Sequence, residues 1–295
     1  MRHKVDDEKR IKKQVMLFLL ICLPVTWILM GVAFGLSKTA GIQASPKGYT
    51  LYMLACFLPA VSAVVCCVVS KENIRSLNFM PKFQGNGKVY VAAVLIGILI
   101  SLTDVPLITI LFFKEAGSLH HDVTIPMIVF QILLYTAIGC LQFYVLMGEE
   151  IGWMGFLFPR LETLCGTNLA IVLTGVIRGL WHIVVLWQNE KFVQNLVLLC
   201  ITNIFGGCLF VLVTKKSGSV VPAAIIHALS NTLPAVMRSF IVLDEVNYEK
   251  KEMLINVLSN VPYFVIMIVC WYLLMKTLHR DAVGKESAYE RKVDS

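Results

Sequence analysis

Charged residues are scarce in this chain. Only 15% of its 295 residues are Asp, Glu, Lys or Arg, whereas 57% are hydrophobic and the mean hydropathy is +0.75. This balance excludes an ordinary soluble protein, in which about a quarter of the residues are charged. The apolar runs are about 20 residues long, enough for a helix to cross roughly 30 Å of hydrocarbon. They also lack the apolar/polar alternation of barrel strands. The sequence therefore predicts an all-α, polytopic helix bundle in a membrane.

The chain also lacks linkers, internal repeats and low-complexity tracts, so residues 1–295 are expected to form a single integral membrane domain. No small-residue cleavage site follows the first apolar run, which is therefore interpreted as a retained helix rather than a signal peptide. About eight transmembrane helices are predicted, at 15–36, 49–70, 89–113, 132–158, 172–190, 193–213, 219–243 and 253–275.

Nine cysteines are present, but their spacing matches no metal motif, and eight of them lie within the apolar spans. Buried free cysteine behaves as a small hydrophobe. Neither a disulfide framework nor a cysteine metal site is predicted.

The net charge of +7 reflects topology rather than nucleic-acid binding. With the spans placed as above, the side that holds both termini carries 18 Lys and Arg residues, and the other side carries six. Cytoplasmic loops are the ones enriched in Lys and Arg, so both termini are predicted to be cytoplasmic. The partners expected are the lipid bilayer and a membrane-delivered substrate, with no nucleic acid.

Five polar side chains interrupt the apolar segments: Glu149, Glu150, His182, His227 and Asn231. Ionisable groups are costly in hydrocarbon, so inside a span they indicate a functional site by default. The fourth span is extended to Phe158 because the residues after the glutamates are as apolar as any span. Glu149 then lies nine residues inside its helix, His227 eight and His182 about ten, all at one depth. These groups are expected to face one shared interior.

Glu149 and Glu150 are adjacent, so on a helix they point about 100° apart and serve different purposes. A carboxylate in a low-dielectric pocket is a stronger base than one in water, which suits Glu149 to accept a proton from water. The alternative is that the pair only caps a helix end or is solvated at the membrane interface.

His227 and Asn231 are four residues apart and share one helix face, as do Arg178 and His182. Asn231 is predicted to position the attacking water, and the imidazoles to donate to the developing oxyanion. Arg178 needs a carboxylate partner at this depth, and the glutamate pair is the nearest supply. Taken alone, a membrane histidine is more often a hydrogen-bonded packing residue, and that interpretation stays open.

These residues resemble the CAAX protease and bacteriocin-processing family, also called the Abi family, of intramembrane proteases. The similarity covers about 145–235, a catalytic core. It rests on Glu149-Glu150 followed by Gly-Trp, Gly-Phe-Leu and Pro-Arg-Leu, on a second motif that ends at His182, and on His227-Ala-Leu-Ser-Asn231. Two positions depart from the family pattern: Met154 stands where the first motif has arginine, and Arg178 stands where the second has an aromatic residue. We hypothesise that Arg178 makes the ion pair with Glu150 that Met154 cannot make.

The resemblance implies a hydrolase that is commonly described as a metalloprotease, with His182, His227 and Glu149 as the ligands if zinc is bound. Similarity to the type II CAAX prenyl proteases favours metal-free hydrolysis instead, in which a glutamate activates the water. Zinc thus stays an alternative and no cofactor is favoured.

The predicted function is an intramembrane endopeptidase that admits a peptide or protein substrate from the membrane or the cytoplasmic side. For a prokaryotic member, located in the cell membrane, the resemblance implies bacteriocin maturation or self-immunity. A prenylated substrate is implied only for a eukaryotic or archaeal member. The alternatives are a catalytically degenerate membrane scaffold or immunity factor, and a proton-relay transporter.

Overall fold

The computed structural model describes residues 2–37, 45–101, 111–114, 117–119, 124–187, 190–238, 241–244, 246–248, 250–251, 254–255, 258–259, 261, 263–273 and 275–276. The helices and strands are α1 Arg2–Ser37, α2 Pro46–Cys56, α3 Leu58–Val69, η3 Ile74–Leu77, α4 Gly87–Ser101, β1 Gly117–Leu119, α6 Ile125–Glu150, π-helix η4 Ile151–Leu157, α7 Phe158–Cys165, α8 Thr167–Trp181, α9 Ile183–Leu186, α10 Phe192–Ser217, α11 Val221–Arg238 and β2 Ile241–Leu243. A further helix covers Tyr263–Leu273. Helices dominate, as predicted; β1 and β2, an antiparallel pair of three-residue strands, were not expected.

Among the residues that the structure describes, two helices are long and apolar enough to cross a membrane, Asp6–Ser37 and Phe192–Ser217. A third span results if α2 and α3, which meet at a 43° bend, are counted together. The bend lies at Phe57, where Pro59 in the first turn of α3 cannot donate the hydrogen bond that would continue α2. The prediction of membrane helices is confirmed at this level, whereas the count of about eight and the cytoplasmic termini stay predictions.

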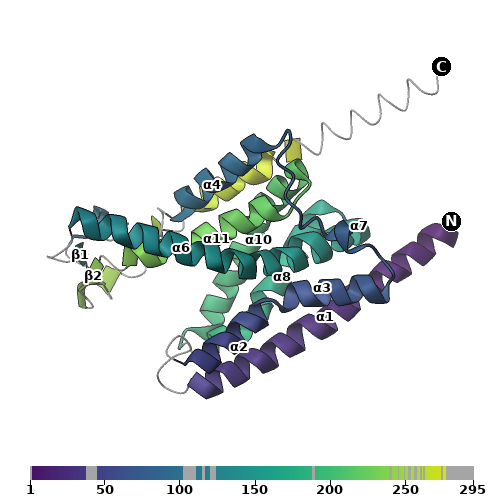
Figure 1. Cartoon of the computed structure of the whole chain (residues 1–295), viewed down its shortest axis with the longest axis horizontal. Coiled ribbons are helices and arrows are strands. Elements are labelled where there is room, and N and C mark those ends of the chain that lie inside the picture. The colour runs from purple at the N-terminus through teal and green to yellow at the C-terminus, as the bar shows by residue number, and fades with distance from the viewer. Residues whose placement is uncertain are drawn as a thin grey trace.

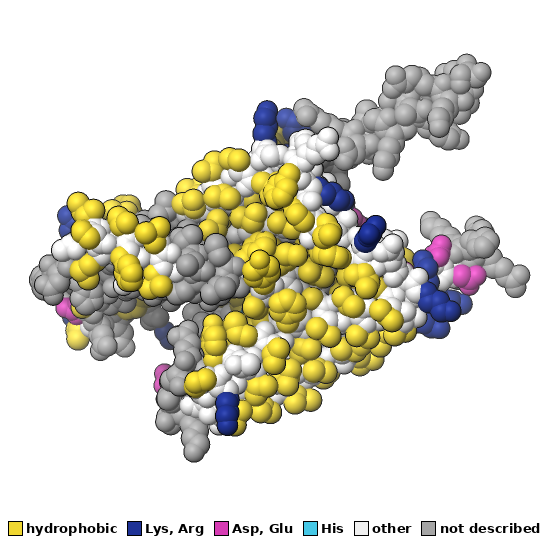
Figure 2. Space-filling model, viewed as in Figure 1, with side chains coloured by type: hydrophobic (Ala, Val, Ile, Leu, Met, Phe, Trp, Pro, Cys, Tyr) yellow, Lys and Arg dark blue, Asp and Glu magenta, His cyan; other side chains and the backbone are white. Residues whose placement is uncertain are grey.

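Figure 1 shows α1, α2 and α3 in one group of helices and α4, α6 and α11 in another. α1 packs against α2 and α3, and α11 packs between α4 and α6. α10 and α8 form the most extensive helix pair, and α3 packs directly on η4. The face drawn in Figure 2 carries apolar side chains across its middle and Lys and Arg side chains toward its ends, as expected for a surface that meets lipid.

Aromatic side chains form much of the core next to the glutamates. Phe18 stacks on Phe156 with 5.1 Å between ring centroids and meets Trp153 edge-on at 5.8 Å. Trp153 in turn meets Trp181 edge-on at 5.9 Å, and all four side chains are almost fully buried. Eight cysteines are free thiols and most of them are buried among apolar side chains, while the side chain of Cys140 lies outside the described residues.

Candidate active site

Glu149 and Glu150 are the last two residues of α6, and both are buried: Glu149 is 4% exposed and Glu150 is not exposed at all. The chain then changes from α-helical to π-helical hydrogen bonding over Ile151–Leu157. π-helical turns are rare and concentrate at functional sites, because the extra residue rotates the side chains before and after them. The buried, adjacent carboxylates exclude the interpretation that the pair is only solvated at an interface.

The sequence predicted that the fourth span ends before Pro159, but the helix does not stop there. It continues directly into α7, Phe158–Cys165, with Pro159 in the first turn. Proline is tolerated there because the N–H that it lacks has no partner within the new helix.

Two glycines allow η4 to pack closely against its neighbours. A Cβ on Gly152 would overlap Pro59 of α3, and a Cβ on Gly155 would overlap the backbone carbonyl of Leu77 in η3. Any side chain at either position would push the π-helix away from α3 and η3. These contacts therefore fix the height and rotation of the glutamate pair.

Arg178, in the last turn of α8, supplies the cation opposite the two glutamates. Its Nη2 lies 2.8 Å from Glu150 Oε1 and 3.6 Å from Glu149 Oε2, and its side chain is only 6% exposed. The predicted contact between Arg178 and the glutamate pair is confirmed. One guanidinium thus faces two carboxylates, and it is closer to Glu150.

His227, on α11, completes the buried cluster. Its Nδ1 lies 3.0 Å from both Glu150 Oε1 and Arg178 Nη2. With its proton on Nε2, the ring accepts from Arg178 through Nδ1; with a proton on Nδ1, it donates to Glu150 instead. The imidazole is therefore placed to exchange a proton with the cluster without moving its ring.

His182 lies just past the end of α8, where the helix breaks before the short α9. Its Nδ1–H donates to the carbonyl oxygen of Arg178 at 2.8 Å. In the neutral ring, Nε2 is therefore the nitrogen that carries no proton. Trp181 beside it meets the imidazole edge-on at 4.6 Å and donates to Thr26 Oγ1 at 2.9 Å. The expected continuous helix over 172–190 was wrong, because the backbone turns at His182.

Asn231 lies one turn after His227 on α11, as predicted, but its side chain is exposed while those of the glutamates are buried. Met154 is 3% exposed and belongs to the apolar core. The arrangement thus brings together Glu149, Glu150, Arg178 and His227, and it leaves Asn231 at the edge.

Among the residues that the structure describes, no three His, Cys, Asp or Glu side chains are arranged to hold a metal ion. His182, His227 and Glu149, the set expected for zinc, are all described and do not converge. The guanidinium of Arg178 instead occupies the space beside Glu150 and His227, where it would repel a second cation.

Sequence reasoning missed a second polar cluster around Arg160 of α7, ten residues after Glu150. Arg160 Nε donates to Gln14 Oε1 at 3.0 Å, Gln14 Nε2 donates to Glu72 Oε1 at 2.7 Å, and Arg160 also pairs with Glu72 Oε2. These residues stand near the ends of apolar runs, where the sequence indicated only topological charge. The polar Gln14 at the start of the first predicted span was the one signal that was available.

The buried cluster contains two carboxylates but one guanidinium, and several of its polar atoms have no aligned partner in the described part of the chain. Among the described residues, no well-aligned hydrogen bond reaches Glu149 Oε2 or either oxygen of Glu150, and the indole N–H of Trp153 also has no partner. A carboxylate oxygen without an aligned donor is open to a further hydrogen bond, such as one from a water molecule. The site can therefore take a proton from a water molecule, beside a cation that limits the negative charge.

Residues 126–233 match a family model described as "Type II CAAX prenyl endopeptidase Rce1-like". The match contains Glu149-Glu150, Arg178, His182, His227 and Asn231. No curated protein matched the chain. The family is membrane-embedded, which agrees with the apolar helices of this structure. Over residues 126–233, about a third of its length, the chain is therefore similar to the type II CAAX prenyl endopeptidase Rce1-like family.

Proposed function

We propose that this protein is an intramembrane endopeptidase that hydrolyses a peptide bond of a membrane-associated substrate. The observation that carries the proposal is the excess of buried carboxylate over cation. Glu149 and Glu150 share one guanidinium, which lies 2.8 Å from Glu150 but 3.6 Å from Glu149. Glu150 is thereby the anchored carboxylate, and Glu149 is the one left to act as a base.

In the proposed reaction Glu149 removes a proton from a water molecule as the water oxygen attacks the carbonyl carbon of the peptide. The tetrahedral intermediate carries its negative charge on the former carbonyl oxygen, where His227 donates a hydrogen bond through Nε2–H. His182 donates there as well when its Nε2 is also protonated, because its Nδ1–H is held by the carbonyl oxygen of Arg178. The C–N bond then breaks, and Glu149 returns its proton to the leaving amine. The second proton of the water stays on the new carboxyl group and passes to the amine, so a carboxylate and an ammonium group leave and the enzyme regains its starting protonation.

Arg178 and Glu150 act in this scheme by holding the base and the imidazoles in place. Arg178 contacts Glu150, Glu149 and His227 from one nitrogen, so it sets the distances among the reacting groups. Asn231 is assigned to the water or to the substrate backbone at the exposed edge of the site. Its exposure supports a role where the substrate enters rather than within the buried cluster.

The substrate class proposed is a peptide or protein segment tethered to the membrane. The matched family model is named for prenyl endopeptidases, which supports a lipid-tethered C-terminal peptide. Bacteriocin maturation or self-immunity is the second physiological setting, which the resemblance alone suggests.

The test is cleavage of a library of membrane-tethered peptides, with and without a prenyl group, by the purified full-length protein in vesicles. Cleavage that is lost in Glu149→Gln supports the proposal, and its persistence in a zinc chelator supports the metal-free route. Loss of cleavage in the chelator, reversed by added zinc, would overturn that route. A well-folded wild-type protein that cleaves nothing in the library would favour the non-catalytic scaffold, with Met154 as the cause.

A further inference from the structure

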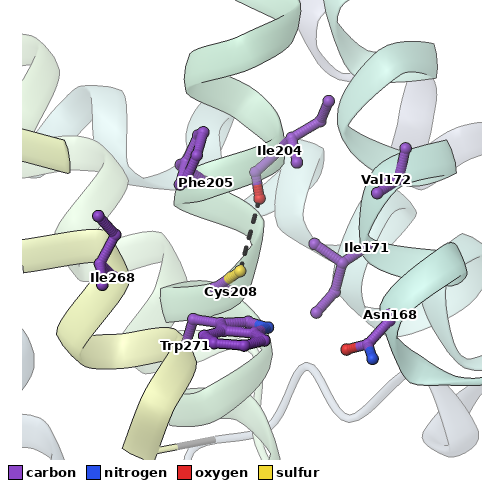
Figure 3. A pocket seen from close by; sticks show the side chains of 8 residues that line it. All are labelled: Asn168, Ile171, Val172, Ile204, Phe205, Cys208, Ile268 and Trp271. Atoms are coloured by element: carbon purple, nitrogen blue, oxygen red, sulfur yellow. Dashed lines mark hydrogen bonds between the residues drawn. The ribbon is translucent and has the colours of Figure 1, made fainter.

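A groove lies away from the glutamates, between α8, α10 and the helix Tyr263–Leu273. It is a half-open groove of about 400 Å³, within the roughly 300–1,000 Å³ range of small-molecule pockets. Its lining consists of Asn168, Ile171, Val172, Ile204, Phe205, Cys208, Ile268 and Trp271, whose side chains point toward one another in Figure 3. Asn168 is the one lining residue with a polar amide.

The groove has a buried floor and an exposed rim. Ile171 and Cys208 form the floor at 3% and 5% exposure, whereas Ile268 and Trp271 at the rim are 54% and 45% exposed. Cys208 makes its hydrogen-bond contact within its own helix, to the carbonyl oxygen of Ile204. The floor therefore presents hydrocarbon and a thiol that already has a partner, which suits a flexible apolar chain.

The helix register places this groove near one end of the bundle. Gly175 packs on Ile204 and Gly179 on Cys200, so α8 and α10 are antiparallel, and the start of α8 lies toward the end of α10. Tyr263 donates to the carbonyl oxygen of Thr202 at 2.9 Å, so the last helix begins beside the middle of α10.

Basic side chains gather at that end. Lys215 and Lys216 occupy the last turn of α10, and Lys276 follows the last helix. Lys215 is paired with Glu162 at 2.8 Å, whereas Lys216 and Lys276 are both exposed. On α10, Lys216 stands eleven residues after Phe205 of the groove, three turns along the same face. This is also the side that the loop charges predict to be cytoplasmic.

We propose that the groove binds one acyl chain of an anionic phospholipid of the cytoplasmic leaflet, with the headgroup at Lys216 and Lys276. An apolar groove alone gives little preference inside a bilayer, because lipid tails are already in an apolar medium. A concave floor that holds the chain, together with lysines at headgroup level, supplies both contact and charge complementarity. The proposal does not depend on the proposed protease activity.

Trp271 provides the measurement, because its indole lies in the groove. The full-length protein is reconstituted in phosphatidylcholine vesicles that contain either phosphatidylglycerol or phosphatidylcholine with brominated acyl chains, at equal mole fraction. Bromine quenches indole fluorescence on contact, and the Trp271→Phe variant isolates the contribution of Trp271. Quenching of this component is expected to show about a fivefold preference for the anionic lipid for each lysine that contributes.

Three variants separate a specific site from general lipid contact. Lys216→Gln with Lys276→Gln should bring quenching by the two lipids to parity, while Lys71→Gln with Lys88→Gln, at other exposed basic positions, should leave the preference intact. Cys208→Phe, which fills the floor, should abolish the preference.

Trp187, which is 71% exposed near the opposite end of α8, should be quenched equally by both lipids. Equal quenching of Trp271 by the two lipids in the wild-type protein, or a preference that survives loss of both lysines, overturns the proposal.

Discussion

Two clusters in this molecule each contain an arginine and glutamate, and both use the helical stretch from α6 to α7: one at Glu149 and Glu150, the other ten residues further along, at Arg160. In the outer cluster, Arg160, Glu72 and Gln14 bond to one another, and Arg160 also donates to the carbonyl oxygen of Phe156 at 3.1 Å. Both oxygens of Glu72 have donors. In the inner cluster two glutamates compete for one arginine, and several carboxylate oxygens have no aligned donor.

The difference shows what each cluster can do. A saturated polar network rigidifies the structure, since every donor has a partner and a proton gains nothing by moving. An unsaturated, buried pair of carboxylates carries a free-energy cost that the fold tolerates only where the groups are used. The comparison therefore assigns stability to the outer cluster and chemistry to the inner one, and each prediction below tests that assignment.

The largest effect is expected from Glu149→Gln. The amide is nearly isosteric but cannot accept a proton from water, so kcat should fall by about 10²–10⁴-fold, the usual contribution of a general base. The thermal unfolding temperature should hold or rise, since a poorly paired buried charge is removed. Peptide cleavage and unfolding in detergent would be measured on the same sample. Loss of folding together with activity would contradict the assignment.

The second prediction tests whether Arg178 takes the role of the arginine that the family's first motif has at the position of Met154. Arg178→Ala leaves Glu150 without its cation, which should abolish detectable cleavage and cost about 3–5 kcal/mol of stability. Position 154 lies four residues after Glu150 on the π-helix. Adding Met154→Arg to Arg178→Ala should therefore restore part of the cleavage activity and part of the stability. Met154→Leu in the same background is the matched control and should restore neither. A double variant that folds but does not cleave would refute the hypothesis that Arg178 replaces the arginine missing at position 154.

The sequence predicted these contacts to different extents, for physical reasons. The ion pair between Arg178 and Glu150 was predictable because a guanidinium at membrane depth requires a carboxylate. The π-helix was not, because Ile151–Leu157 is apolar on all sides and a change from i→i+4 to i→i+5 hydrogen bonds leaves no periodic signal.

The same limits apply outside the buried cluster. The exposure of Asn231 was not predictable, because four-residue spacing fixes a face relative to His227 but not which neighbours cover it. The outer cluster was missed because its members are far apart in the chain, with Gln14 and Arg160 separated by 146 positions.

The third prediction concerns Glu72→Gln in the outer cluster. The change removes the ion pair with Arg160 and places an amide donor beside its guanidinium, so unfolding should become easier by about 1–3 kcal/mol. The kcat should stay within about twofold of wild type, because the reacting groups are untouched. Thermal unfolding and cleavage rates, measured beside Glu149→Gln, should thus show opposite patterns. An activity loss in Glu72→Gln as deep as in Glu149→Gln would remove the distinction between the clusters.

The smallest effects are expected from two glycines that face different neighbours, Gly207 in α10 and Gly152 in the π-helix η4. A Cβ at Gly207 would meet Ile171 at 3.5 Å, an ordinary van der Waals contact, so Gly207→Ala should change stability by no more than about 0.5–1 kcal/mol, in the stabilising direction. Gly152→Ala places the same methyl group onto the backbone of Pro59 and should cost about 1–3 kcal/mol.

The informative quantity for this pair is the ratio of activity loss to stability loss. Gly152 lies two residues after Glu150, so displacement of η4 also displaces the carboxylates, and kcat should fall more than the change in unfolding temperature accounts for. Gly207→Ala should leave kcat unchanged. If Gly152→Ala lowers stability but leaves kcat at the wild-type value, then the packing of η4 on α3 does not position the glutamates, and the inner cluster is held by Arg178 alone.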